Sequence, residues 1–254
     1  MNKIALITGA TAGIGEATAL LFAENNYNVI ITGRRLKRLE KLETRIIRDF
    51  GVNVLSLNFD VRKYNEVEHH LNHLPDEWKN IDILVNNAGL ASGFGSIDQG
   101  NPEDWDKMID TNIKGLLYVS KMIMPLMVKR KQGHIINVAS IAGKEVYLNG
   151  NVYCASKHAV DALSKAMRID LLPHNIKVTN IAPGMIDTEF SLVRYKGNKE
   201  SADNVYRGLK PLYAKDIAEV IYFAVNRPTH VNLNDIVIMP TVQANTSHLI
   251  RKEN

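Results

Sequence analysis

The chain has 254 residues, of which 45% are hydrophobic and 23% are charged, and its formal net charge is +4. A chain of this length can bury a sizeable core in one large α/β domain, so it needs no metal or disulfide to fold. Its basic residues are scattered, which argues against nucleic-acid binding, and no apolar run is long enough to span a bilayer. Cys154 is the only cysteine and no signal-peptide segment is visible, so we expect a reducing, cytoplasmic setting.

Short apolar segments alternate with longer amphipathic ones along the chain. The pattern predicts strands over 3–8, 28–32, 52–58, 81–86, 133–138, 177–181 and 235–239. It predicts helices near 14–25, 36–50, 64–74, 103–130, 151–172 and 214–226. Uniformly apolar strands are typical of a parallel sheet that helices cover on both faces, and strand–helix alternation indicates right-handed βαβ units. We therefore expect a doubly wound α/β fold in a single domain over residues 1–254.

One segment departs from this alternation. Residues from Gly184 to about Tyr213 are polar and follow the sixth strand without a clear period. A long irregular loop inside a compact domain more often serves as a lid or binding segment than as filler. We expect a substrate flap at about 184–213.

A glycine-rich turn joins the first strand to the first helix. Its functional candidates are Gly9, Thr11, Gly13, Ile14 and Gly15. Glycines let the backbone turn tightly and approach a pyrophosphate, whose charge the N–H groups of the following helix can hold. A glycine turn without a ligand is the alternative, but the place between a strand and a helix favours dinucleotide binding.

The end of the second strand indicates which dinucleotide is bound. Folds that bind NAD place a carboxylate here to hold the ribose 2′-hydroxyl. This chain has Arg34 and Arg35 instead, and guanidinium groups bind a 2′-phosphate through paired, charge-assisted hydrogen bonds. These arginines could simply begin a solvated helix, but cations gain nothing from the positive end of a helix dipole. The pattern favours NADP(H).

Three further residues are candidates for the cofactor site. Asp60 and Val61 follow the third strand, where the carboxylate could accept a hydrogen bond from the adenine amine. Asn87 follows the fourth strand and could contact the cofactor or tie neighbouring strands together. Both interpretations of Asn87 stay open at this stage.

Tyr153 and Lys157 lie four residues apart and therefore on one face of a predicted helix. Ionising a free tyrosine at neutral pH costs roughly 4 kcal/mol, and a neighbouring ammonium reduces that cost. The pair could therefore act as a general acid and base. Ser140 could hold the substrate oxygen beside Tyr153, and Asn112 could fix a water behind Lys157.

The motifs T-G-x-x-x-G-I-G, N-N-A-G and Y-x-x-x-K occur in order with Asn112, Ser140 and Pro183-Gly184, and together they resemble the short-chain dehydrogenase/reductase family. The resemblance covers nearly the whole chain. It implies a Rossmann-type sheet of seven parallel strands and usually a homotetramer or homodimer, and we expect a homotetramer. It also implies a catalytic tetrad, whose members are Asn112, Ser140, Tyr153 and Lys157. By the same resemblance, cofactor contacts extend to Pro183, Gly184, Ile186 and Thr188.

Residues 103–112, 188–197 and 230–234 are similar to those of NADP-dependent 3-hydroxy acid dehydrogenases. That resemblance implies hydride transfer between NADP(H) and the 3-hydroxyl carbon of serine, allo-threonine or 3-hydroxypropionate. A substrate carboxylate in a dry pocket needs a partner, and Arg194 is the candidate, with Lys196 and Arg207 as rivals. The alternative to a substrate-binding role is that Arg194 is a solvent-exposed residue of the flap.

Two other functions are compatible with the motifs. A carbonyl reductase for ketones, sugars or pteridines would use the same tetrad, and a non-catalytic NADP(H) sensor could dispense with it. No metal is expected, because His69 and His73 are helix-spaced but lack a third ligand. Cys154 is expected to be a buried thiol rather than a nucleophile, and Trp78 and Trp105 to be core or interface residues.

Overall fold

The computed structural model describes residues 2–252, so Met1, Glu253 and Asn254 of the predicted domain lie outside the described residues. A seven-stranded sheet forms the centre, and every neighbouring pair of strands is parallel. Its order is β3-β2-β1-β4-β5-β6-β9. The chain reverses its direction of winding between β1 and β4, the place where ligands bind in sheets of this kind. The predicted doubly wound sheet of seven strands is confirmed.

The predicted strands are all present with small shifts at their ends. The sheet contains β1 (Ile4–Ile7), β2 (Asn28–Gly33), β3 (Val54–Asn58), β4 (Ile81–Asn86), β5 (Gly133–Val138), β6 (Ile176–Pro183) and β9 (Asp235–Ile238). The largest extension is in β6, which continues to Pro183 because its last residues pair with β9.

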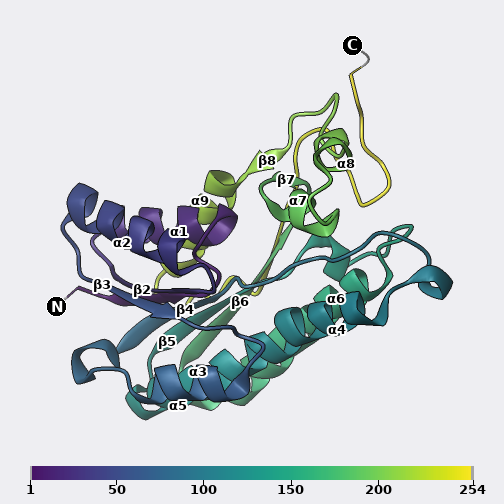
Figure 1. The fold of residues 1–254 in the computed structure, drawn as a ribbon. Coiled ribbons are helices and arrows are strands. Elements are labelled where there is room, and N and C mark those ends of the chain that lie inside the picture. The colour runs from purple at the N-terminus through teal and green to yellow at the C-terminus, as the bar shows by residue number, and fades with distance from the viewer. Residues whose placement is uncertain (1, 253–254) are drawn as a thin grey trace.

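Helices cover both faces of the sheet (Figure 1). One face carries α1 (Gly13–Glu24), α2 (Leu36–Phe50) and α9 (Ala214–Val225). The other carries α3 (Tyr64–Asn72), α4 (Pro102–Ile109), α5 (Leu116–Arg130) and α6 (Asn151–Leu171). Short 3₁₀ turns occur at Asp76–Trp78, Ile97–Gln99, Ile141–Gly143 and Leu172–His174.

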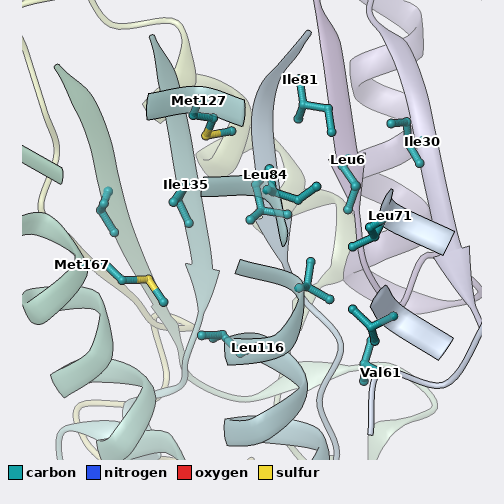
Figure 2. Packing of buried hydrophobic residues seen from close by; sticks show 14 of the residues in the cluster. Leu6, Ile30, Val61, Leu71, Ile81, Leu84, Leu116, Met127, Ile135 and Met167 are labelled. Atoms are coloured by element: carbon teal, nitrogen blue, oxygen red, sulfur yellow. The ribbon is translucent and has the colours of Figure 1, made fainter. Parts of the chain in front are cut away.

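Successive residues of a strand point into two separate hydrophobic cores, because side chains alternate between the two faces of a sheet. Leu6 packs toward α3 and α5, whereas its neighbours Ala5 and Ile7 pack toward α1 and α2. Figure 2 shows the first core, in which Leu6, Leu84 and Ile135 from three strands gather with helix residues. Trp78 belongs to this core, as expected, and Trp105 packs partly buried against a third, smaller cluster beneath Tyr153.

The helix predicted over 103–130 is present without a break, but it is not α-helical throughout. A π-helical segment, Asp110–Gly115, separates α4 from α5 and carries Asn112. Two hydrogen bonds of the Asn112 side chain account for the wider turn. The Leu90 N–H donates to Asn112 Oδ1, and Asn112 Nδ2 donates to the Leu90 carbonyl, both at 2.8 Å. Segments of this type are frequent at functional sites.

The predicted irregular flap is also more ordered than expected. It contains β7 (Ile186–Asp187), α7 (Phe190–Arg194), α8 (Lys199–Asn204) and β8 (Leu212–Tyr213), and β7 pairs with β8. Helices this short are not stable alone, so tertiary contacts must hold them. The Tyr206 hydroxyl donates to the Ile186 carbonyl at 2.6 Å, and Arg251 of the C-terminal segment, which passes beside α8, donates to the Val205 carbonyl (Figure 1).

Candidate active site

A cavity of about 330 Å³ opens at the carboxyl ends of the central strands. Most residues predicted for the cofactor and the chemistry line it: Gly9, Thr11, Gly13, Ile14, Arg34, Arg35, Asp60, Val61, Asn87, Ser140, Tyr153, Lys157, Pro183, Gly184, Ile186 and Thr188. Gly15, Asn112 and Arg194 are not in its lining. The first two lie behind the cavity wall, and Arg194 lines a neighbouring hollow.

The glycine turn has the geometry that an anion-binding loop needs. Gly9 and Gly13 adopt φ angles of +66° and +58°, which glycine adopts more readily than residues with a Cβ. A Cβ on Gly15 would lie 2.4 Å from the Gly9 carbonyl oxygen, so this position must also lack a side chain. The helix α1 begins at Gly13 with no side-chain cap, which leaves its first N–H groups free to bind a ligand.

Asn87 ties the two central strand ends together. Its amide donates to the carbonyl oxygens of Thr8 at 2.9 Å and Gly9 at 3.3 Å. The tying interpretation is therefore what the structure shows, and it holds the glycine turn in place. The residue also borders the cavity, so a cofactor contact stays a prediction.

The two arginines at the end of β2 have different partners. The Arg35 guanidinium donates twice to the Thr11 hydroxyl, at 3.0 and 2.8 Å, and once to Glu189 at 2.8 Å. Arg34 is half exposed and lies 3.7 Å from the Asp60 carboxylate. Both arginines line the cavity, together with the carboxylates that pair with them, Asp60 and Glu189.

The Asp60 carboxylate is bound by a neighbour that sequence reasoning did not include. Arg62 donates to it from the backbone N–H and from the guanidinium, the closest approach being 2.6 Å. Partial burial opposes ionisation of Asp60, but the hydrogen bonds and charge of Arg62 outweigh it and lower the carboxyl pKa. Asp60 is therefore charged, and much of its capacity to accept hydrogen bonds is already used.

Tyr153 and Lys157 project from the first turns of α6 and are both buried. The Lys157 ammonium lies 6.0 Å from the centre of the Tyr153 ring and donates to the Val138 carbonyl at 2.8 Å. Gly89 leaves room for it, since a Cβ there would lie 3.3 Å from both Lys157 Nζ and Asn112 Oδ1. The structure thus brings three members of the predicted tetrad to one place.

Burial moves the two pKa values in opposite directions. It lowers the pKa of Lys157 to about 8, because a buried ammonium loses hydration. Burial also raises the pKa of Tyr153, with a contribution from Tyr147, while a hydrogen bond with Ser140 and the charge of Arg194 act against it. Tyr153 is therefore a neutral phenol that can donate a proton, and stabilising its phenolate requires nearby positive charge.

Ser140, the fourth tetrad candidate, follows β5. Its hydroxyl oxygen accepts from the Ala142 N–H at 3.1 Å and lies 3.4 Å from the Pro183 carbonyl. The hydroxyl is also close enough to Tyr153 to oppose the rise of the tyrosine pKa. This places two hydroxyl groups side by side at the cavity wall.

Arg194 lies in a hollow of about 210 Å³ that also contains Tyr153. Its guanidinium carbon is 4.7 Å from the ring centre of Phe94 and 5.8 Å from that of Tyr153. One terminal nitrogen donates to the Tyr147 hydroxyl at 2.8 Å, while the buried Nε has no partner among the described residues. A buried donor without a partner is costly, so this edge of the guanidinium suits a ligand.

The two rival clamps are not placed for that role. Lys196 Nζ pairs with the Asp104 carboxylate at 2.8 Å. Arg207 is exposed and lines neither hollow. Arg194 stays the predicted clamp, because the Lys196 ammonium, which lines the same hollow, already has a carboxylate partner and Arg207 lies outside both hollows.

Residues 3–198 match the family model described as short chain dehydrogenase, which covers well over half of the chain. The chain belongs to the short chain dehydrogenase family. Among curated short chain dehydrogenases, it is 45% identical to the NADP-dependent 3-hydroxy acid dehydrogenase YdfG of Salmonella typhi, over 95% of this chain and 96% of that one. It is 42% identical to serine 3-dehydrogenase of Agrobacterium fabrum over the full length of both.

Solved structures of short chain dehydrogenases agree. The closed form of a serine dehydrogenase complexed with NADP+ superposes with a TM-score of 0.92 at 42% identity, covering 98% of this chain and all of that one. Serine dehydrogenase from Escherichia coli gives a TM-score of 0.82 at 40% identity, with 95% and 99% covered. The family resemblance predicted from the motifs is confirmed.

Some residues of the site carried no signal in the sequence. Glu189 binds Arg35 and Arg38, and Asp104 binds Lys196, across separations of about 90 to 150 positions. Only the fold brings such pairs together. The basic cluster around Arg35 was visible, but nothing local indicated which carboxylate faces it.

Proposed function

We propose that this short chain dehydrogenase transfers a hydride between NADP(H) and the 3-hydroxyl carbon of a small 3-hydroxy acid such as serine, allo-threonine or 3-hydroxypropionate. The observation that carries the substrate class is the unpartnered Nε of the Arg194 guanidinium beside Tyr153. A carboxylate is the natural partner of a guanidinium, because parallel N–H groups can bind its two oxygens. The names of the curated relatives support the same substrate class.

The cavity fits a dinucleotide with a 2′-phosphate. Backbone N–H groups at the start of α1 would hold the pyrophosphate, and the Arg34 and Arg35 guanidinium groups would hold the 2′-phosphate. The predicted contacts of Thr11, Val61, Ile186 and Thr188 stay part of this proposal. NADP+ supplies the hydride acceptor when it is bound, and the protein supplies the rest.

The proton chemistry follows from the tetrad candidates. In reduction, Tyr153 Oη donates its proton to the substrate oxygen as the hydride arrives at the carbon, and Ser140 holds that oxygen beside it. The Lys157 ammonium stabilises the phenolate that remains, and in oxidation this phenolate takes the proton of the substrate hydroxyl. The Asn112 side chain bonds Leu90 and Ser156, and from this position it would fix a water behind Lys157.

We further propose that the protein is a homotetramer in a reducing cytoplasm. Large apolar side chains are exposed at the end of α6, at Ile169 and Leu172, and on α9 and β9, at Phe223 and Val237. Two independent contact areas are what a tetramer with crossed two-fold axes requires. The buried, unpaired thiol of Cys154 fits a reducing setting, and burial raises its pKa, which disfavours a nucleophilic role.

Replacing Arg194 by Met tests the substrate class. We expect KM for 3-hydroxypropionate to rise at least tenfold, while a neutral alcohol changes by less than about twofold, because only the acid loses a charged partner. Arg207→Met is the matched control, since Arg207 is an exposed arginine of the same flap.

Initial rates with NADP+ over a panel of acids and neutral alcohols provide the measurement. Equal losses for both substrate classes would contradict the assignment of Arg194. Strong turnover of neutral ketones without turnover of any 3-hydroxy acid would favour a carbonyl reductase of other specificity.

A further inference from the structure

Glu189, immediately before α7, connects the flap to the basic end of the cavity. Its carboxylate accepts from Arg35 at 2.8 Å and from Arg38 at 2.7 Å. The hydrogen bond from Arg35 and the positive charge of both arginines lower the carboxyl pKa, so Glu189 is ionised at neutral pH. The carboxylate also borders the cofactor cavity.

The same guanidinium of Arg35 is the proposed partner of the 2′-phosphate. A carboxylate and a phosphate monoester bind the same planar N–H groups, and two anions at one guanidinium repel each other. Glu189 and the 2′-phosphate are therefore alternatives at Arg35, or at best neighbours that oppose each other.

We propose that the Glu189 carboxylate competes with the 2′-phosphate of NADP(H) for Arg35, so that cofactor binding and release are coupled to the attachment of the flap. The identity of the cofactor rests on the proposed function. Binding of the 2′-phosphate loosens the contact between α7 and α2, and return of Glu189 to Arg35 favours cofactor release.

Glu189 could instead orient Arg35 for the phosphate, which would have the opposite effect on affinity. Two observations favour competition. The Thr11 hydroxyl already orients Arg35 through two hydrogen bonds. The Glu189 and Arg35 side chains are 43% and 44% exposed, and ion pairs this exposed add little orientation or stability.

Calorimetric titration of NADP+ and NAD+ into wild type, Glu189→Gln and Glu200→Gln tests the proposal. Glu200 is an exposed flap carboxylate without an ion pair among the described residues, so its variant controls for net charge. We expect Glu189→Gln to lower the Kd of NADP+ about two- to fivefold, the size expected for an exposed ion pair, and to leave NAD+ unchanged. Unchanged or weaker NADP+ binding in this variant would overturn the proposal.

Hydrogen exchange over residues 189–195 gives a second readout that needs no substrate. In wild type, NADP+ should change the exchange of this segment more than NAD+ does, and Glu189→Gln should abolish that difference. An unchanged difference in the variant would also overturn the coupling. If wild type binds NADP+ no more tightly than NAD+, the proposed cofactor is wrong. In that case the competition stands only if Glu189→Gln binds NADP+ more tightly than NAD+.

Discussion

At the scale of single residues, the site depends on an ammonium that is expensive to bury. Lys157 is almost fully buried, and its hydrogen bond to the Val138 carbonyl brings no compensating charge. Such a group is retained for chemistry rather than for stability. The cost of burying it is measurable, and its pH dependence follows from the lowered pKa.

Replacing Lys157 by Met should stabilise the protein at pH 7 while abolishing activity. The folded pKa is about 8 and the ordinary value is 10.5, so below pH 8 both states are protonated and the burial cost is present in full. Between pH 8 and pH 10.5 the unfolded chain binds more protons than the folded protein, so the free energy of unfolding of wild type rises with pH. We expect Lys157→Met to be more stable at pH 7 by on the order of 2 kcal/mol, with the difference shrinking toward pH 10.

Urea unfolding at the two pH values provides the measurement. Lys129→Met is the control, because Lys129 is an exposed lysine of α5. Its variant should have the same stability as wild type at both pH values. A Lys157→Met variant that is less stable than wild type at pH 7 would contradict the account of a costly buried charge.

At the scale of elements, the flap is fastened at Arg194 and Lys196 to the loop after β4 and to the first turn of α4. The Gly93 N–H donates to the Arg194 carbonyl at 3.0 Å, and Lys196 pairs with buried Asp104, which also accepts from Ser92 at 2.7 Å. Gly93 lies so close that a Cβ there would be 3.0 Å from the Asp104 carboxylate. These contacts hold the guanidinium of Arg194 over Tyr153.

Asp104→Asn should therefore loosen α7. We expect faster hydrogen exchange over residues 190–197 and a several-fold rise in KM for 3-hydroxypropionate with a smaller change in kcat, because binding of the carboxylate is disturbed more than the chemistry. Asp203→Asn is the control, since it breaks an exposed ion pair of the same flap. Equal kinetics in both variants would show that the Asp104 pair has no positioning role.

The sequence predicts these elements unequally well. The pattern of apolar residues predicts the exact bounds of β4 and β5, because the apolar segment of a buried strand ends sharply. It misses the π-helical segment, since Asn112 widens that turn through a tertiary bond to Leu90 that no local pattern encodes. The order of the flap was unpredictable for the same reason.

At the scale of the whole molecule, helices on both faces leave the sheet's last strand, β9, at an edge. Val237 on that strand is 49% exposed, and Leu172 beyond α6 is 76% exposed. Exposed apolar side chains of this size mark contact surfaces when they cluster. No described helix is both long and apolar enough to cross a membrane.

A tetramer would have about four times the chain mass of 28.4 kDa. We expect this mass from light scattering after gel filtration, and we expect Ile169→Asp with Leu172→Asp to reduce it, because a charge in an apolar contact is costly. Lys129→Met serves again as a surface control. A monomeric wild type would contradict the proposed assembly without affecting the chemistry of the site.

The candidate site as a whole was more predictable than its surroundings. The residues that the reaction needs, such as Tyr153 and Lys157, have a characteristic spacing on one helix face, and the structure places them together. Partners chosen by packing, such as Glu189 for Arg35 and Asp104 for Lys196, depend on how distant segments meet in space. Sequence alone therefore indicates the reaction better than it indicates the substrate.

The most direct test of the central claim is the rate of NADP+ reduction with 3-hydroxypropionate, followed by the absorbance of the reduced nicotinamide, for wild type and Tyr153→Phe. The proposed function predicts turnover by wild type with NADP+ well above that with NAD+. It also predicts a loss of at least a hundredfold in kcat for the variant, since general acid–base catalysis contributes that much, while NADP+ still binds. Turnover with NAD+ alone, or a Tyr153→Phe variant as active as wild type, would contradict it.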